Sequence, residues 1–405
     1  MSPIPANRLR DVPRYIFSTL EKTIESARQD GREICDLSQS DPNWPASARI
    51  VEALRRAALE PGAHRYPPYE GANGLRDAFA DWYSRTYDAR CRRENVLIFE
   101  GSKLAIAMLP LAYVDPGESA LVPDPGYPTY AAGVGLAGGE AVPLVLRPEL
   151  HYLPDYADLD EERIENARLM FLNYPHNPTG ATASVPFLEE TIAFCRRRDL
   201  PLAYDLAYAK IVLRGQGPAL SVRSAVRGAE DLAIELFTFS KSYDMQGFRL
   251  GAAVGSPDLL APLARVHENV AAGAYLPIQA AGCAALDPHE DQSLAQRVAG
   301  YARRQDLISS AISELGGHAT RPDATVYIWM HAPRDMNGEA FAQELLEQAG
   351  VAVTPGIAFG QQGDRYVRFS LTAEDEEIEE AARRLHQVYA AGFDKAPVRA
   401  ARGPS

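Results

Sequence analysis

Short apolar runs alternate with helical segments through the middle of this chain. Seven of these runs have the length and the composition of buried strands. They cover residues 96–99, 120–123, 142–146, 169–172, 202–204, 234–239 and 250–254. Because parallel strands need crossover connections, this alternation predicts an α/β fold with a largely parallel sheet. In such a sheet, side chains with a chemical role gather at the carboxyl ends of the strands.

One lysine, Lys241, directly follows the apolar strand predicted at residues 234–239. Lysine occurs at only five positions in the chain, so a generic surface charge is the less favoured explanation here. Burial disfavours an ammonium ion, and a lysine at this place either reaches solvent or is held as a reactive amine. An amine can form a Schiff base with an aldehyde, which a guanidinium cannot. For this segment alone, a strand and turn with a solvated lysine is the alternative.

Other residues near strand ends suit a phosphate group. Thr238 can supply a hydroxyl and Arg249 a planar cation. Gly101 and Ser102 follow the strand at 96–99 and precede a helix, whose free N-terminal amides form an anion site. Pyridoxal 5'-phosphate (PLP) is the cofactor that combines an aldehyde with a phosphate. The lysine and its neighbours therefore point to this cofactor.

Further strand ends supply groups that suit the pyridine ring of PLP. Asp205 ends an apolar strand, where an ionised carboxylate needs a partner such as a pyridinium nitrogen. Asn177 and Tyr208 could share the phenolate oxygen, and Tyr127, in a rigid turn, could stack on the ring. A helix N-cap is the alternative explanation of Asp205.

An arginine, Arg368, interrupts an otherwise apolar strand predicted at residues 366–370. Its planar fork suits a bidentate hold on the α-carboxylate of an amino acid. An arginine on an edge strand that faces water is the alternative.

The segment Ser-Lys-Ser-Tyr-Asp-Met-Gln-Gly-Phe-Arg-Leu-Gly at residues 240–251 resembles the lysine segment of fold-type I PLP enzymes, specifically class I/II aminotransferases. The resemblance extends from Arg8 to Val388. The wider pattern is most similar to LL-diaminopimelate aminotransferase-like members, and it includes residues 7–9, 15–17, 101–103 and 354–356. The resemblance implies an α/β chain of fold type I, with a mostly parallel seven-stranded sheet in a large domain and a smaller α+β domain.

The resemblance also implies how the chain divides. Residues 46–288 form the large PLP-binding domain, and residues 289–395 form the small C-terminal domain. Residues 1–45 join the small domain, and residues 396–405 are expected to be a disordered tail. By the same resemblance, Tyr66 reaches across a dimer interface to the cofactor phosphate of the neighbouring subunit. We therefore expect a homodimer with shared active sites.

The resemblance assigns a role to individual residues of this sequence. Lys241 is the residue that bonds to the cofactor and moves the substrate proton, with Asp205 and Tyr208 as further catalytic residues. The residues expected to bind the cofactor are Gly101, Ser102, Lys103, Tyr127, Asn177, Asp205, Tyr208, Thr238, Lys241, Arg249 and Tyr66. The residues expected to bind the substrate are Arg368, Ser40, Asn177 and Tyr15. No metal site is expected.

These residues predict an aminotransferase of the EC 2.6.1 type, which moves an amino group between an L-amino acid and a 2-oxo acid through a Lys241 Schiff base. Two departures from the family leave an alternative open. Ser38, Gln39 and Ser40 stand where glycines are usual, and Leu104 stands where relatives tend to carry glutamate. The alternative is β- or γ-elimination, replacement or cyclisation of an amino acid on the same fold. A regulatory or binding protein that keeps the fold without catalysis is a third hypothesis.

The bulk composition argues against several other classes. The net charge of -13 argues against binding to a nucleic acid backbone. The four cysteines are widely spaced and form no CxxC pair, so neither a zinc site nor a disulfide framework is indicated. No apolar run reaches the roughly 18 residues of a membrane span, and the first residues lack the apolar core of a signal peptide. We therefore expect a cytoplasmic protein with small-molecule substrates.

Overall fold

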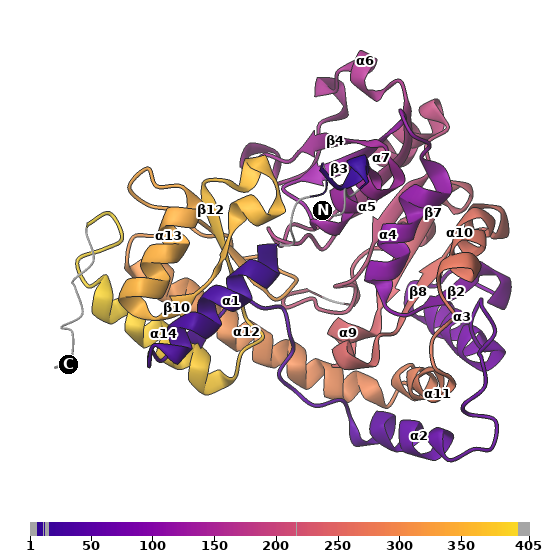
Figure 1. The fold of residues 1–405 in the computed structure, drawn as a ribbon, viewed down its shortest axis with the longest axis horizontal. Helices are drawn as coiled ribbons and strands as arrows, with labels where there is room; N and C mark the ends of the chain where they lie inside the picture. Colours follow the sequence, from indigo (N-terminus) through magenta and orange to yellow (C-terminus); the bar gives the residue numbers. More distant parts are fainter. Residues whose placement is uncertain (1–5, 11, 13–15, 216, 396–405) are drawn as a thin grey trace, which may run out of the picture.

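A seven-stranded sheet forms the centre of the larger part of the molecule (Figure 1). The computed structural model describes residues 6–10, 12, 16–215 and 217–395. In spatial order, the strands are β2 (Val96–Phe99), β8 (Gly251–Val254), β7 (Ala233–Thr238), β6 (Leu202–Asp205), β5 (Ala167–Asn173), β3 (Ser119–Asp124) and β4 (Glu140–Val145). Within this sheet, β8 runs in the direction opposite to that of the other strands. The predicted strands and the mostly parallel sheet are confirmed.

Helices cover both faces of this sheet, because its central strands are apolar on both sides. Along β5, Leu169 and Phe171 pack into one core cluster, whereas Met170 and Leu172 pack into another. The helices of this part are α2 (Ala48–Ala58), α3 (Asn73–Tyr87), α4 (Ser102–Tyr113), α5 (Thr129–Ala137), α6 (Glu161–Ile164), α7 (Val185–Arg198), α8 (Val222–Ala225), α9 (Phe239–Ser242), α10 (Pro257–Val270) and α11 (Leu276–Ala285). The two-sided cover leaves the strand ends as the place where polar side chains can meet.

A second core surrounds a small antiparallel sheet made of β9 (Tyr327–His331), β11 (Thr354–Pro355) and β12 (Tyr366–Ser370). Its helices are α12 (Glu290–Glu314), α13 (Gly338–Glu344) and α14 (Asp375–Val388). The run Val-Ala-Val-Thr-Pro at residues 351–355 predicts a single strand, and this prediction is wrong. The chain forms two short strands there, since β10 (Val351–Ala352) pairs with β1 (Cys35–Asp36) whereas β11 pairs with β12.

The N-terminal segment packs on this second core. Helix α1 (Ile16–Gln29) lies beside α13 and β10 (Figure 1). Backbone bonds join Cys35 N to Gly350 O over 2.8 Å and Leu37 N to Ala352 O over 2.9 Å. These contacts agree with the expectation that the N-terminal segment joins the small domain. The expected disordered tail at 396–405 lies outside the described residues.

One of two expectations for a polar residue of the large sheet, Glu235, is confirmed, because its carboxylate is paired structurally. The alternation of β7 suggests that Glu235 is solvated or paired structurally, but its side chain is buried. Its carboxylate accepts hydrogen bonds from Tyr83 (2.7 Å) and Ser221 (2.8 Å). Burial raises the pKa of Glu235. The solvated alternative is therefore wrong, because β7 is a central strand with helices on both faces.

The described part of the chain contains neither a membrane-spanning helix nor a cluster of metal ligands. Within it, no helix is both long enough and apolar enough to span a membrane. Within the same residues, no group of three or more His, Cys, Asp or Glu side chains is placed to hold a metal ion.

Candidate active site

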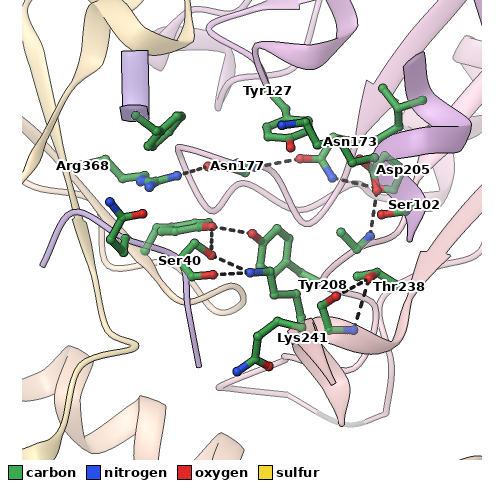
Figure 2. Close-up of a pocket in the computed structure, with 18 of the residues that line it drawn as sticks. Ser40, Ser102, Tyr127, Asn173, Asn177, Asp205, Tyr208, Thr238, Lys241 and Arg368 are labelled. Atoms are coloured by element: carbon green, nitrogen blue, oxygen red, sulfur yellow. Dashed lines mark hydrogen bonds between the residues drawn. The ribbon is translucent and has the colours of Figure 1, made fainter. Parts of the chain in front are cut away.

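A cavity of about 310 Å³ lies at the carboxyl ends of the parallel strands (Figure 2). Three strands of the large sheet, β5, β6 and β7, each end in one of its lining residues. The second core contributes Tyr327 from β9 and Arg368 from β12, and the N-terminal segment contributes Gln39 and Ser40. The cavity therefore forms where three separate parts of the chain meet.

Most of the residues predicted for the site line this cavity. They are Ser40, Ser102, Lys103, Tyr127, Asn177, Asp205, Tyr208, Thr238, Lys241, Arg249 and Arg368. The structure does not bring Tyr66 to the cavity, since its side chain is 89% exposed on the loop before α3. Tyr15 lies outside the described residues.

Lys241 projects from α9 toward the N-terminal segment (Figure 2). The helix begins after Thr238, whose hydroxyl accepts a bond of 3.2 Å from Ser240 N. Nζ of Lys241 donates to the backbone oxygen of Ser40 and, over 2.9 Å, to its Oγ. Burial lowers the pKa of the Lys241 amine. A lowered pKa increases the fraction of neutral amine, which is the nucleophilic form.

Asp205 ends β6 and presents a buried carboxylate to the cavity. Tyr130 donates to Oδ2 over 2.7 Å, and Ala207 N donates to Oδ1 over 2.9 Å. No helix begins after Asp205, so the N-cap alternative is wrong. Burial raises the pKa of Asp205 to about 6, against the effect of its two donors. A cation at this wall of the cavity would favour the ionised carboxylate.

A set of donors at the start of α4 suits a phosphate group. Gly101 precedes the helix with φ of +94°, and a Cβ there would lie 2.5 Å from Nη2 of Arg249. The hydroxyls of Ser102, Thr238 and Ser240 line the same cavity. Helix N-terminal amides, hydroxyls and a guanidinium are together the donor set that phosphate prefers. Ser240 is an addition to the residues predicted from the sequence.

Arg368 lies in the middle of its sheet and is only 1% exposed. The alternative of a water-facing edge arginine is therefore wrong. Its guanidinium donates to Asn177 Oδ1 over 2.9 Å and to Ser38 O over 3.0 Å. Among the described residues, no carboxylate forms an ion pair with Arg368. A buried cation without an anionic partner is suited to a ligand carboxylate.

Sequence reasoning missed three residues that hold the site together. Asn173 accepts from Asn177 N over 2.8 Å and donates to Asp205 O over 2.8 Å. Tyr130, in α5, donates to the carboxylate of Asp205. Tyr327 bonds to both Ser40 and Tyr208. The end of an apolar strand is a signal that could have found Asn173, whereas no sequence signal marks Tyr327.

Comparison with known proteins places these residues in a family. A model of the family described as aminotransferase class I and II matches residues 32–385. The chain belongs to the aminotransferase class I and II family. The family resemblance stated from the sequence and the expectation of an aminotransferase are confirmed.

Several relatives carry the name LL-diaminopimelate aminotransferase. The protein of that name from Moorella thermoacetica is 42% identical over 386 residues, which cover 95% of this chain and 98% of the relative. That from Desulforudis audaxviator is 39% identical, with 95% and 98% covered. Among solved structures, apo-BacF from Bacillus subtilis has a TM-score of 0.89 at 35% identity, with 96% of this chain and 99% of that chain covered. The aminotransferase fold is therefore shown over nearly the whole chain.

Proposed function

We propose that this aminotransferase uses PLP to move an amino group between an L-amino acid and a 2-oxo acid. The observation that carries the proposal is one cavity that brings together the Lys241 amine, the Asp205 carboxylate and the Arg368 guanidinium. The amine suits the aldehyde of PLP, the carboxylate its ring nitrogen, and the guanidinium the carboxylate of an amino acid. Once bound, PLP supplies an electron-withdrawing ring beside the α-carbon of the substrate.

The described residues fit this cofactor in each of its parts. The phosphate would be held by Gly101, Ser102, Lys103, Thr238 and Arg249, with Ser240 beside them. Tyr127 would lie against the ring, Asn177 and Tyr208 would bind its phenolate oxygen, and Asp205 would hold the proton of its nitrogen. The fit rests on the donor set at α4 and on the raised pKa of Asp205, which a neighbouring cation would lower.

Two residues then act on the substrate. Arg368 would bind its α-carboxylate, since the guanidinium is buried and has no ion-pair partner among the described residues. Nζ of Lys241 would take the proton from the α-carbon and return a proton later in the transfer. Ser40, which holds that amine, would lie beside the substrate.

The names of the relatives suggest a first substrate. LL-diaminopimelate is the amino acid in the names of relatives that are 36% to 42% identical to this chain. We propose it as the first amino donor to test, with other L-amino acids beside it.

The absorption spectrum of the purified protein, recorded while single amino acids are added, tests this proposal. Bleaching of the visible band together with a matching 2-oxo acid in the mass spectrum is the expected result. Product without bleaching would contradict it and favour elimination, replacement or cyclisation. The bond between Ser40 Oγ and Lys241 is the observation that favours this second function, because glycine is usual in that loop of the family.

A homodimer in the cytoplasm completes the proposal. The exposed Tyr66 supports a site shared with a neighbouring subunit, and the four free cysteines suit a reducing compartment. Light scattering measures the mass in solution, and a fully active monomer would contradict the shared site.

The affinity for PLP should fall as the pH drops below about 6, the value to which burial raises the pKa of Asp205. The carboxylate that would bind the protonated ring nitrogen is ionised only above this value. Each pH unit below it should reduce the affinity by up to about tenfold. Fluorescence titration with PLP between pH 5 and 8 measures this.

Asp205→Asn is the matched control for this pH dependence. The ionisations of PLP itself affect both proteins equally, so the difference between them reports Asp205. The variant should bind PLP weakly at every pH, and the ratio of the wild-type affinity to the variant affinity should fall toward 1 as the pH drops to 5. A constant ratio would contradict the proposed role.

A further inference from the structure

Tyr327 is a buried residue of the second core that reaches the cavity. On β9 it pairs with Ser370 of β12, while Trp329 pairs with Arg368. Tyr327 and Arg368 are therefore diagonal neighbours on one face of the sheet. The guanidinium carbon of Arg368 lies 4.1 Å from the centre of the Tyr327 ring, which is a close cation–π contact.

The hydroxyl of Tyr327 connects three parts of the chain. It donates to Ser40 Oγ over 2.6 Å and lies 2.5 Å from the hydroxyl of Tyr208. Ser40 Oγ also accepts from Lys241 Nζ over 2.9 Å. Two successive hydrogen bonds thus link Tyr327 to the Lys241 amine, and one cation–π contact links its ring to Arg368.

We propose that Tyr327 is a positioning residue, which holds Ser40 and thereby sets the charge state and the place of the Lys241 amine. Through its ring it also joins this amine to the arginine that would bind the substrate carboxylate. The inference rests on the proposed function for the roles of the two residues that Tyr327 links, Lys241 and Arg368. The contacts themselves do not depend on that function.

The charges around Lys241 give the direction of the effect. Burial lowers the pKa of the amine, and Arg368 and Arg249 act in the same direction. Tyr327 and Asp41 act in the opposite direction and favour the ammonium form. Burial would raise the pKa of Tyr327, but Arg368, Lys241 and the hydrogen bonds with Ser40 and Tyr208 together hold this pKa below its usual range. Removing the hydroxyl should therefore increase the neutral fraction of Lys241.

Tyr327→Phe tests the proposal, because phenylalanine keeps the ring against Arg368 and removes only the hydroxyl. The full-length chain, freed of PLP, is treated briefly with acetic anhydride between pH 6 and 10, and peptide mass spectrometry measures acetylation of each lysine. The chain has only five lysines, so the acetylation of each can be followed separately. Lys210, which pairs with Asp291 over 2.6 Å, is the internal reference for the acetylation of Lys241.

We expect the midpoint of Lys241 acetylation to fall by at least about half a pH unit in Tyr327→Phe, which is about a threefold gain in reactivity at neutral pH. Lys210 should not change. An unchanged Lys241 midpoint would overturn the proposal. Tyr156→Phe is the matched control, since it removes a buried hydroxyl bonded to Thr191 over 2.8 Å, away from the cavity. An equal shift in that control would also overturn the proposal.

Ser40→Ala provides a second, independent variant. If Tyr327 acts through Ser40 Oγ, adding Tyr327→Phe to Ser40→Ala should move the Lys241 midpoint less than Tyr327→Phe does alone. Fully additive shifts would exclude this route. Acetylation needs neither PLP nor turnover, so a shifted midpoint in a protein that makes no 2-oxo acid would contradict the proposed function and leave this inference intact.

Discussion

Lys241→Ala is expected to reduce turnover by a factor on the order of 10⁴ or more, because it removes the amine that would both bond to PLP and transfer the substrate proton. In the described structure Ser40 holds the amine in the cavity that Asp205 and Arg368 also line. Single-turnover kinetics with an amino acid that the wild type accepts measure the loss.

Two variants separate the reactive amine from its charge. Lys241→Arg keeps a cation in the cavity but cannot bond to an aldehyde, and it should be as inactive as the alanine variant. Lys210→Ala removes a lysine that pairs with Asp291 outside the cavity, and it should keep its activity. Wild-type turnover in Lys241→Ala would reject the proposed function.

Arg368→Gln should lower kcat/KM for an amino acid by about 10² to 10³, because a lost charge-assisted pair with a buried carboxylate costs about 3 to 4 kcal/mol. The affinity for PLP should fall less than kcat/KM does, since Arg368 bonds to one residue expected to bind the cofactor, Asn177, but to none of the phosphate donors. The decarboxylated amine of the same substrate is the control, because it has no carboxylate to lose. An equal loss for amine and amino acid would contradict this role.

Thermal unfolding gives a second test of Arg368. The guanidinium is buried without an ion-pair partner among the described residues, so its removal should not lower the melting temperature of the free protein. Arg304→Gln is the contrast, because Arg304 is also buried but pairs with Asp375 over 2.5 Å. That variant should be less stable. A large loss of stability in Arg368→Gln would make it a structural residue.

The sequence predicts the large sheet and much of the site for the same physical reason. Its strands are apolar on both faces, so a polar residue such as Asp205 or Lys241 marks the place where a strand ends. Glu235 lies within a strand instead, where the alternation alone leaves open whether it is solvated or paired, and hydrogen bonds from Tyr83 of α3 and from Ser221 before α8 decide for the pair. The alternation of polar and apolar residues along one strand does not indicate which side chain of another element will bond to a polar residue in it.

The second core is harder to predict for a related reason. Its strands are short, and β10 and β11 are neighbours in the sequence that belong to different sheets. Tyr327 shows the same difficulty at the level of one residue. An aromatic residue in an apolar strand predicts core packing, and only the docking of Ser40 and Tyr208 against it makes its hydroxyl part of the site.

The contacts that build the cavity join residues that are very far apart in the chain. Lys241 and Ser40 are 201 positions apart, Tyr327 and Ser40 are 287 apart, and Arg368 and Ser38 are 330 apart. Contacts of such long range form late in folding, since closing the intervening loop is entropically unfavourable. The seven-stranded sheet needs only residues 96–254 and can assemble while the ribosome is still adding the second core. Lys241 should therefore behave as an ordinary solvated amine on the nascent chain and become reactive only when the strand that carries Arg368 has docked.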